Sequence, residues 1–322
     1  MSAHAGAPAS SSTAAPLSWK PFAALALFLV IGPSVIYPVF LMKALCFALF
    51  ACAFNILLGF TGLLSFGHAA FLGMASYGSA HAAKVWGFTP ELAILFGTLV
   101  AMLLGIVIGM LTIRSRGIYF ANITLAFAQM VFFFCLQAKF TGGEDGIQSV
   151  QRGKLFGLIS LQSDMVMYVF VAIVFFLTFL LIYRIIHSPF GQVLRAVREN
   201  EARATSLGYK VEQYKLAAFV LSATLVGLAG AVKALVFQLA SLTDVSWQMS
   251  GEVVLMTLLG GVGTIFGPAV GAFVIVSMEN YLAELGSWVT VIQGVIFVLC
   301  VLFFRRGIVG TLSDLWSKRQ SH

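Results

Sequence analysis

Long apolar runs dominate the sequence, and short polar or glycine-rich segments separate them. The hydrocarbon core of a bilayer is about 30 Å thick, so an α-helix needs roughly 20 apolar residues to cross it. The pattern therefore predicts an all-α polytopic membrane protein with about ten transmembrane helices, and eight at the fewest. The expected spans are 22–42, 44–61, 66–83, 91–113, 117–138, 165–187, 214–240, 250–265, 267–284 and 288–304.

Glycine interrupts two of these regions, and there we expect broken or re-entrant helices. One break lies at 59–67, and the other lies within 250–284, a run too long for one helix and short for two. Non-helical backbone is tolerated at membrane depth only where protein or a water-filled cavity surrounds it. The breaks therefore mark a candidate transport pathway, and turns at the membrane surface are the alternative. The candidate pathway residues are Asn55, Gly62, Ser65, Gly67, His68, Gly261, Gly263 and Gly267.

Small residues at helical spacing predict close contact between helices. Gly105 and Gly109 form one GxxxG pair, and Gly263, Gly267 and Gly271 form two in succession. Glycine at this spacing lets two helix backbones approach each other.

His68 is the one titratable side chain that we expect well inside the apolar core. Two interpretations are open: a hydrogen-bonded packing group, or a proton relay or contact to a solute. Ser65 lies one helical turn before it, as a nucleophile beside a base would. The GxSxG elbow is absent, and a triad needs a further orienting group, so an intramembrane hydrolase is the weakest of the alternatives.

Few other ionisable side chains fall within the expected spans. Lys233 lies within one, and Glu252, Glu279 and Glu284 lie close to outer ends. Transporters driven by an ion gradient usually bury such groups at mid-membrane, where each is costly. Their scarcity argues against an ion-coupled secondary transporter.

The composition excludes several other classes of protein. Hydrophobic residues make up 60% of the 322 positions and charged residues only 10%, against about 25% charged in a soluble domain. The chain is therefore neither a soluble enzyme nor disordered. Its net charge of +7 is explained by Lys and Arg on the cytoplasmic side of a membrane, and nucleic acid is not an expected partner.

The distribution of basic residues predicts that both termini are cytoplasmic. With the N-terminus inside, thirteen of the 19 Lys and Arg residues fall on the inner side, as the positive-inside rule requires. We expect a disordered cytoplasmic tail at 1–20, a transmembrane domain at 21–306 and a cytoplasmic tail at 307–322.

The inner loop 188–213 has the pattern of an amphipathic helix. Pro189 is suited to start the helix, Val193 and Val197 belong to its apolar side, and Gly208 is suited to end it. Glu199 and Arg203 are one turn apart and are expected to pair. A cytoplasmic helix between two spans can dock into a groove of another protein; an ordinary connection lying on lipid headgroups is the alternative. The residues expected to serve such docking are Arg195, Arg198, Glu199, Glu201, Arg203 and Gly208.

The outer loop 139–164 contains a second motif, which is rich in glycine and acidic residues. We expect it to shape this loop or to contact a partner outside the membrane. Its residues are Thr141, Gly142, Gly143, Asp145 and Gly146, with Glu144 between them.

No sequence of the form GxxxxGK[ST] is present, and no inner segment is long enough to hold an ATPase domain. If ATP drives this protein, a separate chain must supply the ATPase. No cofactor or metal site is implied by any motif or spacing.

Four separated strings resemble a known family, in the same order along the chain from about residue 40 to 306. They are NILLGFTGLLSFGHAAF at 55–71, TGGEDGI at 141–147, SPFGQVLRAVRENEARATSLGY at 188–209 and GGVGTIFGPAVGA at 260–272. Together they resemble the branched-chain amino-acid permeases of ATP-binding-cassette (ABC) transporters, LivM type.

The resemblance implies a non-catalytic subunit of a bacterial inner membrane that contacts lipid. It implies as partners a second, related permease of the LivH type, two ATP-binding subunits and a periplasmic solute-binding protein. It also assigns the stretch 199–208 to coupling with the ATPases, although Gly208 comes one residue later than the usual EAA–three residues–Gly pattern. Branched-chain amino acids are the expected substrates, and urea or another small polar solute is the alternative.

Overall fold

Helices form all the long elements of the part of the chain that the structure describes. The structure is a computed structural model that describes residues 20–282 and, beyond them, 288, 291, 292, 294, 295, 298 and 307–310. The helices are α1 (Lys20–Val35), α2 (Pro38–Asn55), α3 (His68–Lys84), α4 (Pro90–Thr112), α5 (Ile118–Gln137), α6 (Asp164–His187), α7 (Pro189–Glu199), α8 (Glu201–Ser206), α9 (Val211–Phe237), α10 (Trp247–Gly260) and α11 (Gly267–Tyr281).

Shorter elements lie between these helices. A π-helical turn, η1 (Ile56–Thr61), continues α2, and three 3-10 turns follow: η2 (Lys139–Thr141), η3 (Gly143–Asp145) and η4 (Leu242–Val245). Two-residue strands form two small antiparallel pairs, β1 with β4 and β2 with β3. The strands are β1 (Ile147–Gln148), β2 (Lys154–Leu155), β3 (Ile159–Ser160) and β4 (Leu239–Ala240).

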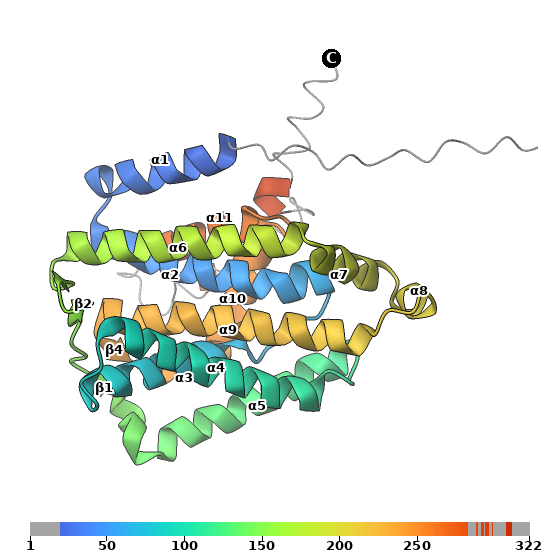
Figure 1. Ribbon diagram of the computed structural model, residues 1–322, viewed down its shortest axis with the longest axis horizontal. Helices are drawn as coiled ribbons and strands as arrows, with labels where there is room; N and C mark the ends of the chain where they lie inside the picture. The colour runs from blue at the N-terminus through green and yellow to red at the C-terminus, as the bar shows by residue number, and fades with distance from the viewer. Residues whose placement is uncertain are drawn as a thin grey trace, which may run out of the picture.

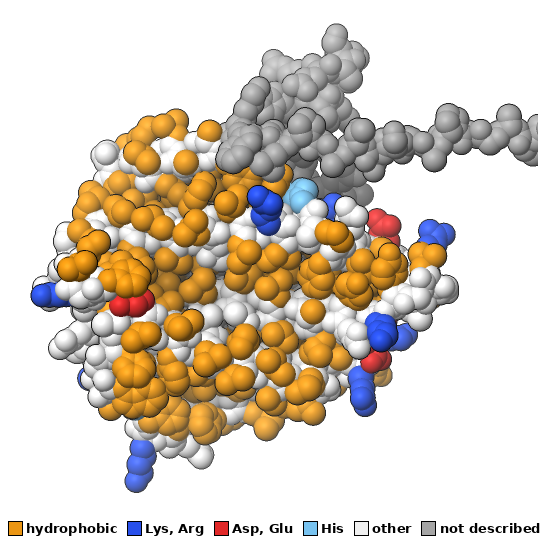
Figure 2. Space-filling view, in the orientation of Figure 1, with side chains coloured by type: hydrophobic (Ala, Val, Ile, Leu, Met, Phe, Trp, Pro, Cys, Tyr) orange, Lys and Arg blue, Asp and Glu red, His pale blue; other side chains and the backbone are white. Residues whose placement is uncertain are grey.

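The long helices lie side by side along one axis (Figure 1). One end of the bundle holds α7 and α8 and is called the α7 end below; the opposite end holds β1, β2 and β4 and is called the β1 end. Apolar side chains cover the broad face between the ends, and most charged side chains in view lie at the ends (Figure 2). Within the described residues, five helices are long and apolar enough to cross a membrane: α2 with η1, α4, α5, α6 and α9. The prediction of an all-helical polytopic membrane protein is thus confirmed, while the count of about ten spans stays a prediction.

The predicted boundary between the first two spans, at residue 43, is wrong. The chain breaks instead at Ile36 and Tyr37, and α2 begins at Pro38. Proline favours the first turn of a helix and forces the preceding residue out of the helical region, and Tyr37 is extended, with ψ 128°. Lys43, expected in an outer loop, is therefore part of α2.

A proline within α1 leaves one carbonyl without its helical partner. Pro33 has no N–H, so the carbonyl of Leu29, four residues earlier, receives no helical hydrogen bond. The Tyr168 hydroxyl of α6 donates to this oxygen at 2.7 Å. The contact replaces the missing bond and fastens α1 to α6.

The centre of the bundle is formed by α2 and α9. In the most apolar stretch of α2, 89% of residues are buried, against 28% in α5. Glycine at 105 and 109 brings α4 against α9, where a Cβ at Gly105 would touch Ala223 and one at Gly109 would touch Phe219. The predicted GxxxG contact is thus present.

Two crossings of the bundle are only partly helical. Residues 62–67 are non-helical, and α3 begins at His68, against the middle of α2 and α9. In the second crossing, β4 and η4 precede α10, whose 14 residues span only about 21 Å. The expected break within 250–284 lies at 261–266, where the chain turns back into α11. The expected span 288–304 and the tails 1–20 and 307–322 lie largely outside the described residues.

Candidate coupling site and transport pathway

The end of α2 that contacts α7 is irregular, because its last turn, η1, is π-helical. It ends at Gly62, which adopts a left-handed conformation with φ 78°. Such wide turns occur mostly as single insertions, frequently at functional sites. The irregular turn allows the chain to leave α2 and return toward α3 without leaving the bundle.

Asn55 joins the two breaks of the chain. Its side-chain amide donates to the carbonyl of Thr264 at 2.8 Å, and its side-chain oxygen accepts from the backbone N–H of Gly263 at 3.0 Å. A Cβ at Gly59 would overlap both the Asn55 side chain and the Gly263 nitrogen. Glycine is therefore required where α2 meets the 261–266 turn.

Arg198 of α7 contacts both breaks as well. Its guanidinium donates to the carbonyl of Gly59, and its aliphatic stem lies against Gly62. The same guanidinium lies next to Gly263. The neighbouring Arg195 places its guanidinium 5.4 Å from the ring centroid of Phe60, within range of a cation–π contact. One helix at the α7 end thus touches the ends of both broken crossings.

The inner loop contains two helices, not the single helix that was expected. Ser188 caps α7 by accepting from the backbone N–H of Gly191, and Asn200 caps α8 by accepting from Arg203 at 2.9 Å. Asparagine favours this cap position, where its side chain satisfies a free N–H. Because the chain breaks at Asn200, the expected pair of Glu199 with Arg203 does not form, and both side chains are exposed.

Glu201 is the residue that holds α8 in place. Its carboxylate lies 2.7 Å from the ammonium of Lys215, which is buried in α9, and 3.6 Å from Arg116 in the link between α4 and α5. Gly208 follows α8 with φ 87°, a conformation that glycine adopts at helix ends without strain. Sequence reasoning included Glu201 and Gly208 but not Lys215 or Arg116.

His68 is enclosed at the start of α3 and hydrogen-bonded at both ring nitrogens. Its Nδ1 lies 2.9 Å from Ser65 Oγ and its Nε2 lies 3.1 Å from Ser222 Oγ. Ser222 donates its own proton to the carbonyl of Ala53, so Nε2 donates and Nδ1 accepts. This pattern describes a neutral imidazole that joins α2, α3 and α9 as a packing group. Among the residues that the structure describes, no acidic group of the kind that a hydrolase triad needs contacts the ring.

Gly67 lies beside this histidine, in the non-helical segment. A Cβ there would overlap the carbonyl of Thr124 in α5, and the Thr124 hydroxyl accepts from the backbone N–H of Phe66 at 3.2 Å. The non-helical backbone is therefore satisfied by protein, as membrane depth requires.

The glycine-rich outer motif shapes the backbone at the β1 end. The Thr141 hydroxyl is buried 2.6 Å from the carbonyls of Cys135 and Ala138. Gly142 and Gly146 have positive φ angles, and a Cβ at Gly146 would overlap the carbonyl of Ala240. The motif thereby positions β1 against β4, where the second broken crossing begins. Its Gly143 also has a positive φ, and Glu144 and Asp145 are exposed.

A cluster of charged side chains lies near the β1 end, and it was not predicted from the sequence. The ammonium of Lys43 lies 3.1 Å from Glu279, and Lys233 forms an ion pair with Asp244. Lys233, Glu252 and Glu279 were noted only as isolated residues, and Asp244 was not noted. These partners are far apart in sequence, so only the fold brings them together.

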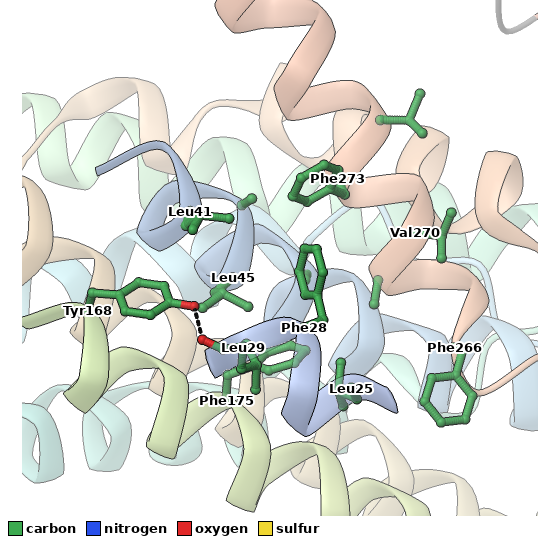
Figure 3. Close-up of a pocket in the computed structure, with 14 residues that line it drawn as sticks. Leu25, Phe28, Leu29, Leu41, Leu45, Tyr168, Phe175, Phe266, Val270 and Phe273 are labelled. Atoms are coloured by element: carbon green, nitrogen blue, oxygen red, sulfur yellow. Dashed lines mark hydrogen bonds between the residues drawn. The ribbon is translucent and has the colours of Figure 1, made fainter. Parts of the chain in front are cut away.

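The cavity between α1, α2, α6 and α11 is unsuited to a polar solute. It has a volume of about 320 Å³ and is lined by Leu, Phe, Ala and Val side chains with Tyr168. Figure 3 shows Phe28, Phe175, Phe266 and Phe273 around it, with the Tyr168 hydroxyl occupied by Leu29. No polar group is left to bind a solute, so this cavity is not the pathway.

Residues 38–302 match the family described as "Branched-chain amino acid transport system / permease component". The chain is 26% identical over 278 residues to the high-affinity branched-chain amino acid transport system permease protein LivM of Escherichia coli K12. That match covers 79% of this chain and 65% of the relative, so the aligned region spans less than two thirds of the relative's length.

Two further relatives differ in the solute that their names state. A probable branched-chain amino acid permease LivM of Methanocaldococcus jannaschii is 29% identical over 195 residues, which cover 55% of this chain and 53% of that protein. The ribose import permease RbsC of Bacillus subtilis is 27% identical over 239 residues, which cover 69% of this chain and 70% of that protein. No solved structure matches the chain significantly.

Proposed function

This chain belongs to the family of permease components of branched-chain amino acid transport systems, and from that premise we propose that it forms half of the transport path of an ATP-driven importer. It is a multi-pass, non-catalytic membrane subunit. The solute is a branched-chain or related amino acid, with urea or another small polar solute as the alternative. The partners are a second permease of the LivH type, two ATP-binding subunits and a periplasmic solute-binding protein, in a bacterial inner membrane.

The main support for this proposal is that Arg198 contacts both breaks of the chain, one at Gly59 and the other at Gly263. A helix outside the apolar part of the bundle reaches the ends of two partly helical crossings through one side chain. In many transporters discontinuous helices line the solute site, and parts of the fold move around that site during transport. A partner that moves α7 therefore moves both crossings at once.

The α7 end faces the cytoplasm in this proposal. Basic side chains concentrate there, on the links between helices and on α7 and α8. Lys and Arg are retained on the cytoplasmic side during insertion, and the same side carries the ATPases of an importer. The basic residues at this end include Arg114, Arg116, Arg184, Arg195, Arg198, Arg203 and Lys210.

The test is reconstitution of the chain with its proposed partners in proteoliposomes. We expect uptake of leucine to require the loaded binding protein, both permeases and ATP enclosed with the ATPase subunits. The control is the same complex with an ATPase subunit that does not hydrolyse ATP. Uptake that follows an imposed proton or sodium gradient without ATP, or uphill uptake by this chain alone, would replace this proposal with a secondary transporter.

A sugar is the second candidate substrate, because a ribose permease is among the relatives. The charge cluster near the β1 end favours an amino acid instead. A sugar offers hydroxyl groups, which hydrogen-bond to carboxylates and ammonium groups but form no ion pair with them, whereas an amino acid does both. Competition of unlabelled ribose against labelled leucine in the reconstituted complex separates the two candidates.

A further inference from the structure

Five charged side chains from five elements lie together near the β1 end, and we call them the ion cluster. Charged groups within a membrane-spanning bundle are costly and usually mark a solute or ion pathway. The Glu252 carboxylate lies within electrostatic reach of the other four. The ion cluster consists of Lys43 of α2, Lys233 of α9, Asp244 of η4, Glu252 of α10 and Glu279 of α11.

Four of these side chains form two ion pairs. Lys43 pairs with Glu279 across 3.1 Å, and Lys233 pairs with Asp244. Both ammonium groups lie near the Phe47 ring, at 6.0 Å for Lys43 and 5.8 Å for Lys233 from its centroid. In each pair the carboxylate balances the charge of its lysine.

Two carboxylate positions in the ion cluster lack a partner. Glu252 is half-buried and makes no ion pair or hydrogen bond within the described residues. Asp244 is only 2% exposed, and its Oδ2 has no hydrogen-bond partner there. A buried carboxylate oxygen without a donor is unfavourable. The ion cluster is therefore incomplete, and the group that completes it must be a cation or a strong donor.

One member of the ion cluster, Lys43, lines a cavity at the β1 end. The cavity has a volume of about 330 Å³ and lies between the α1–α2 link and the ends of α9 and α11. Pockets for small ligands start at about 300 Å³. A small solute in the cavity therefore reaches Lys43, whose side chain is 30% exposed and whose partner Glu279 is 19% exposed.

We propose that the ion cluster is a binding site for the ammonium and carboxylate groups of an amino acid in transit. The solute ammonium donates to Glu252, the half-buried carboxylate that has no partner within the described residues. The solute carboxylate accepts from Lys43, whose ammonium has three donors and uses one of them on Glu279. This inference rests on the proposed function and adds to it the residues that recognise a zwitterion.

The ion cluster would recognise the ammonium and carboxylate groups of the solute and make no contact that depends on its side chain. Both contacts are made to groups that all amino acids share. Selection among amino acids would then fall to the binding protein, while solutes without an ammonium group would be excluded at this site.

The experiment compares Glu252→Gln with Glu91→Gln in the complete reconstituted transporter. Glu91 is half-buried near the β1 end and outside the ion cluster, and its contact to the Phe156 N–H is one that glutamine also makes. We expect Glu252→Gln to lower leucine uptake about tenfold or more at limiting solute, as a charged hydrogen bond is lost. ATP hydrolysis stimulated by the loaded binding protein should stay within about twofold of the parent. Glu252→Asp should restore uptake in part.

Three outcomes would overturn the proposal in distinguishable ways. Equal uptake by the parent and Glu252→Gln would show that the ion cluster does not bind the solute, and it would leave the proposed function intact. Failure of Glu252→Gln to co-purify with the second permease would show that Glu252 binds a basic side chain of that partner instead. Absence of ATP-dependent uptake by the parent complex would overturn the proposed function, and the site with it.

Discussion

At the scale of single residues, the α7 end depends on side chains that do more than one task. Asn55 uses both its donor and its acceptor on the 261–266 turn, and Arg198 combines a hydrogen bond with packing of its stem. The sequence showed that these residue types lie in glycine-rich strings. It could not show their partners, because Asn55 and Thr264 are separated by 209 positions.

Replacement of Arg198 by alanine should uncouple ATP hydrolysis from transport. The variant loses a charged hydrogen bond to Gly59, which is worth about 1.5–3 kcal/mol, so we expect uptake to fall about tenfold or more. The ATPase subunits should still co-purify, because exposed residues of α7 and α8 remain. The matched control is Arg184→Ala, an exposed arginine of α6 outside the proposed docking residues. Normal uptake by Arg198→Ala would exclude this residue from coupling.

Replacement of Gly59 by alanine should destabilise the junction of the two breaks. The added methyl overlaps Asn55 and the Gly263 backbone, and overpacking of this kind costs about 1–3 kcal/mol. The control is Gly251→Ala, where a Cβ meets nothing within 4 Å. Thermal unfolding in detergent should show a lower midpoint for Gly59→Ala alone, and equal midpoints would contradict the tight contact.

At the scale of elements, the outer motif and the second broken crossing form one unit. Gly142 and Gly146 allow β1 to reach β4, and β4 leads through η4 into α10. The glycine positions were recognised from the sequence, and they were expected to shape this loop or to contact a partner. In the structure, Gly142 and Gly146 have positive φ angles that shape the loop; contact with a partner stays a prediction.

Replacement of Gly146 by alanine tests this role. Alanine at a positive φ is strained by about 1 kcal/mol or more, and here its methyl also overlaps the carbonyl of Ala240. Gly157→Ala is the control, because Gly157 has a similar φ of 73° and open space around it. We expect faster amide hydrogen exchange in 239–246 for Gly146→Ala, with little change for Gly157→Ala.

At the scale of the whole molecule, hydropathy alone predicted an all-helical polytopic membrane protein. The long apolar helices appear where the runs placed them, since a crossing helix needs only local length and composition. The boundary at Pro38, the two helices of the inner loop and the ion cluster were not predicted. The boundary at Pro38 and the division of the inner loop depend on which local residues end one helix and start the next. The ion cluster depends on ion pairs such as Lys43 with Glu279, which are 236 positions apart in the sequence.

Labelling from either side of the membrane tests the orientation of the whole molecule. Leu158 at the β1 end is 87% exposed and Leu207 at the α7 end is 70% exposed, so each tolerates a change to cysteine. An impermeant thiol reagent added to intact cells should label Leu158→Cys and spare Leu207→Cys. The reverse pattern would place α7 outside and contradict the proposed coupling; the parent chain measures the background.

The path of α11 has a consequence for communication between the two sides of the membrane. This helix begins at the turn that Asn55 holds and ends beside Lys43. If solute at Lys43, which pairs with Glu279 of α11, and nucleotide at the distant ATPases both bias the position of this one helix, their binding free energies are reciprocally linked. Whatever factor a nucleotide imposes on the affinity for solute, solute must then impose on the affinity for that nucleotide.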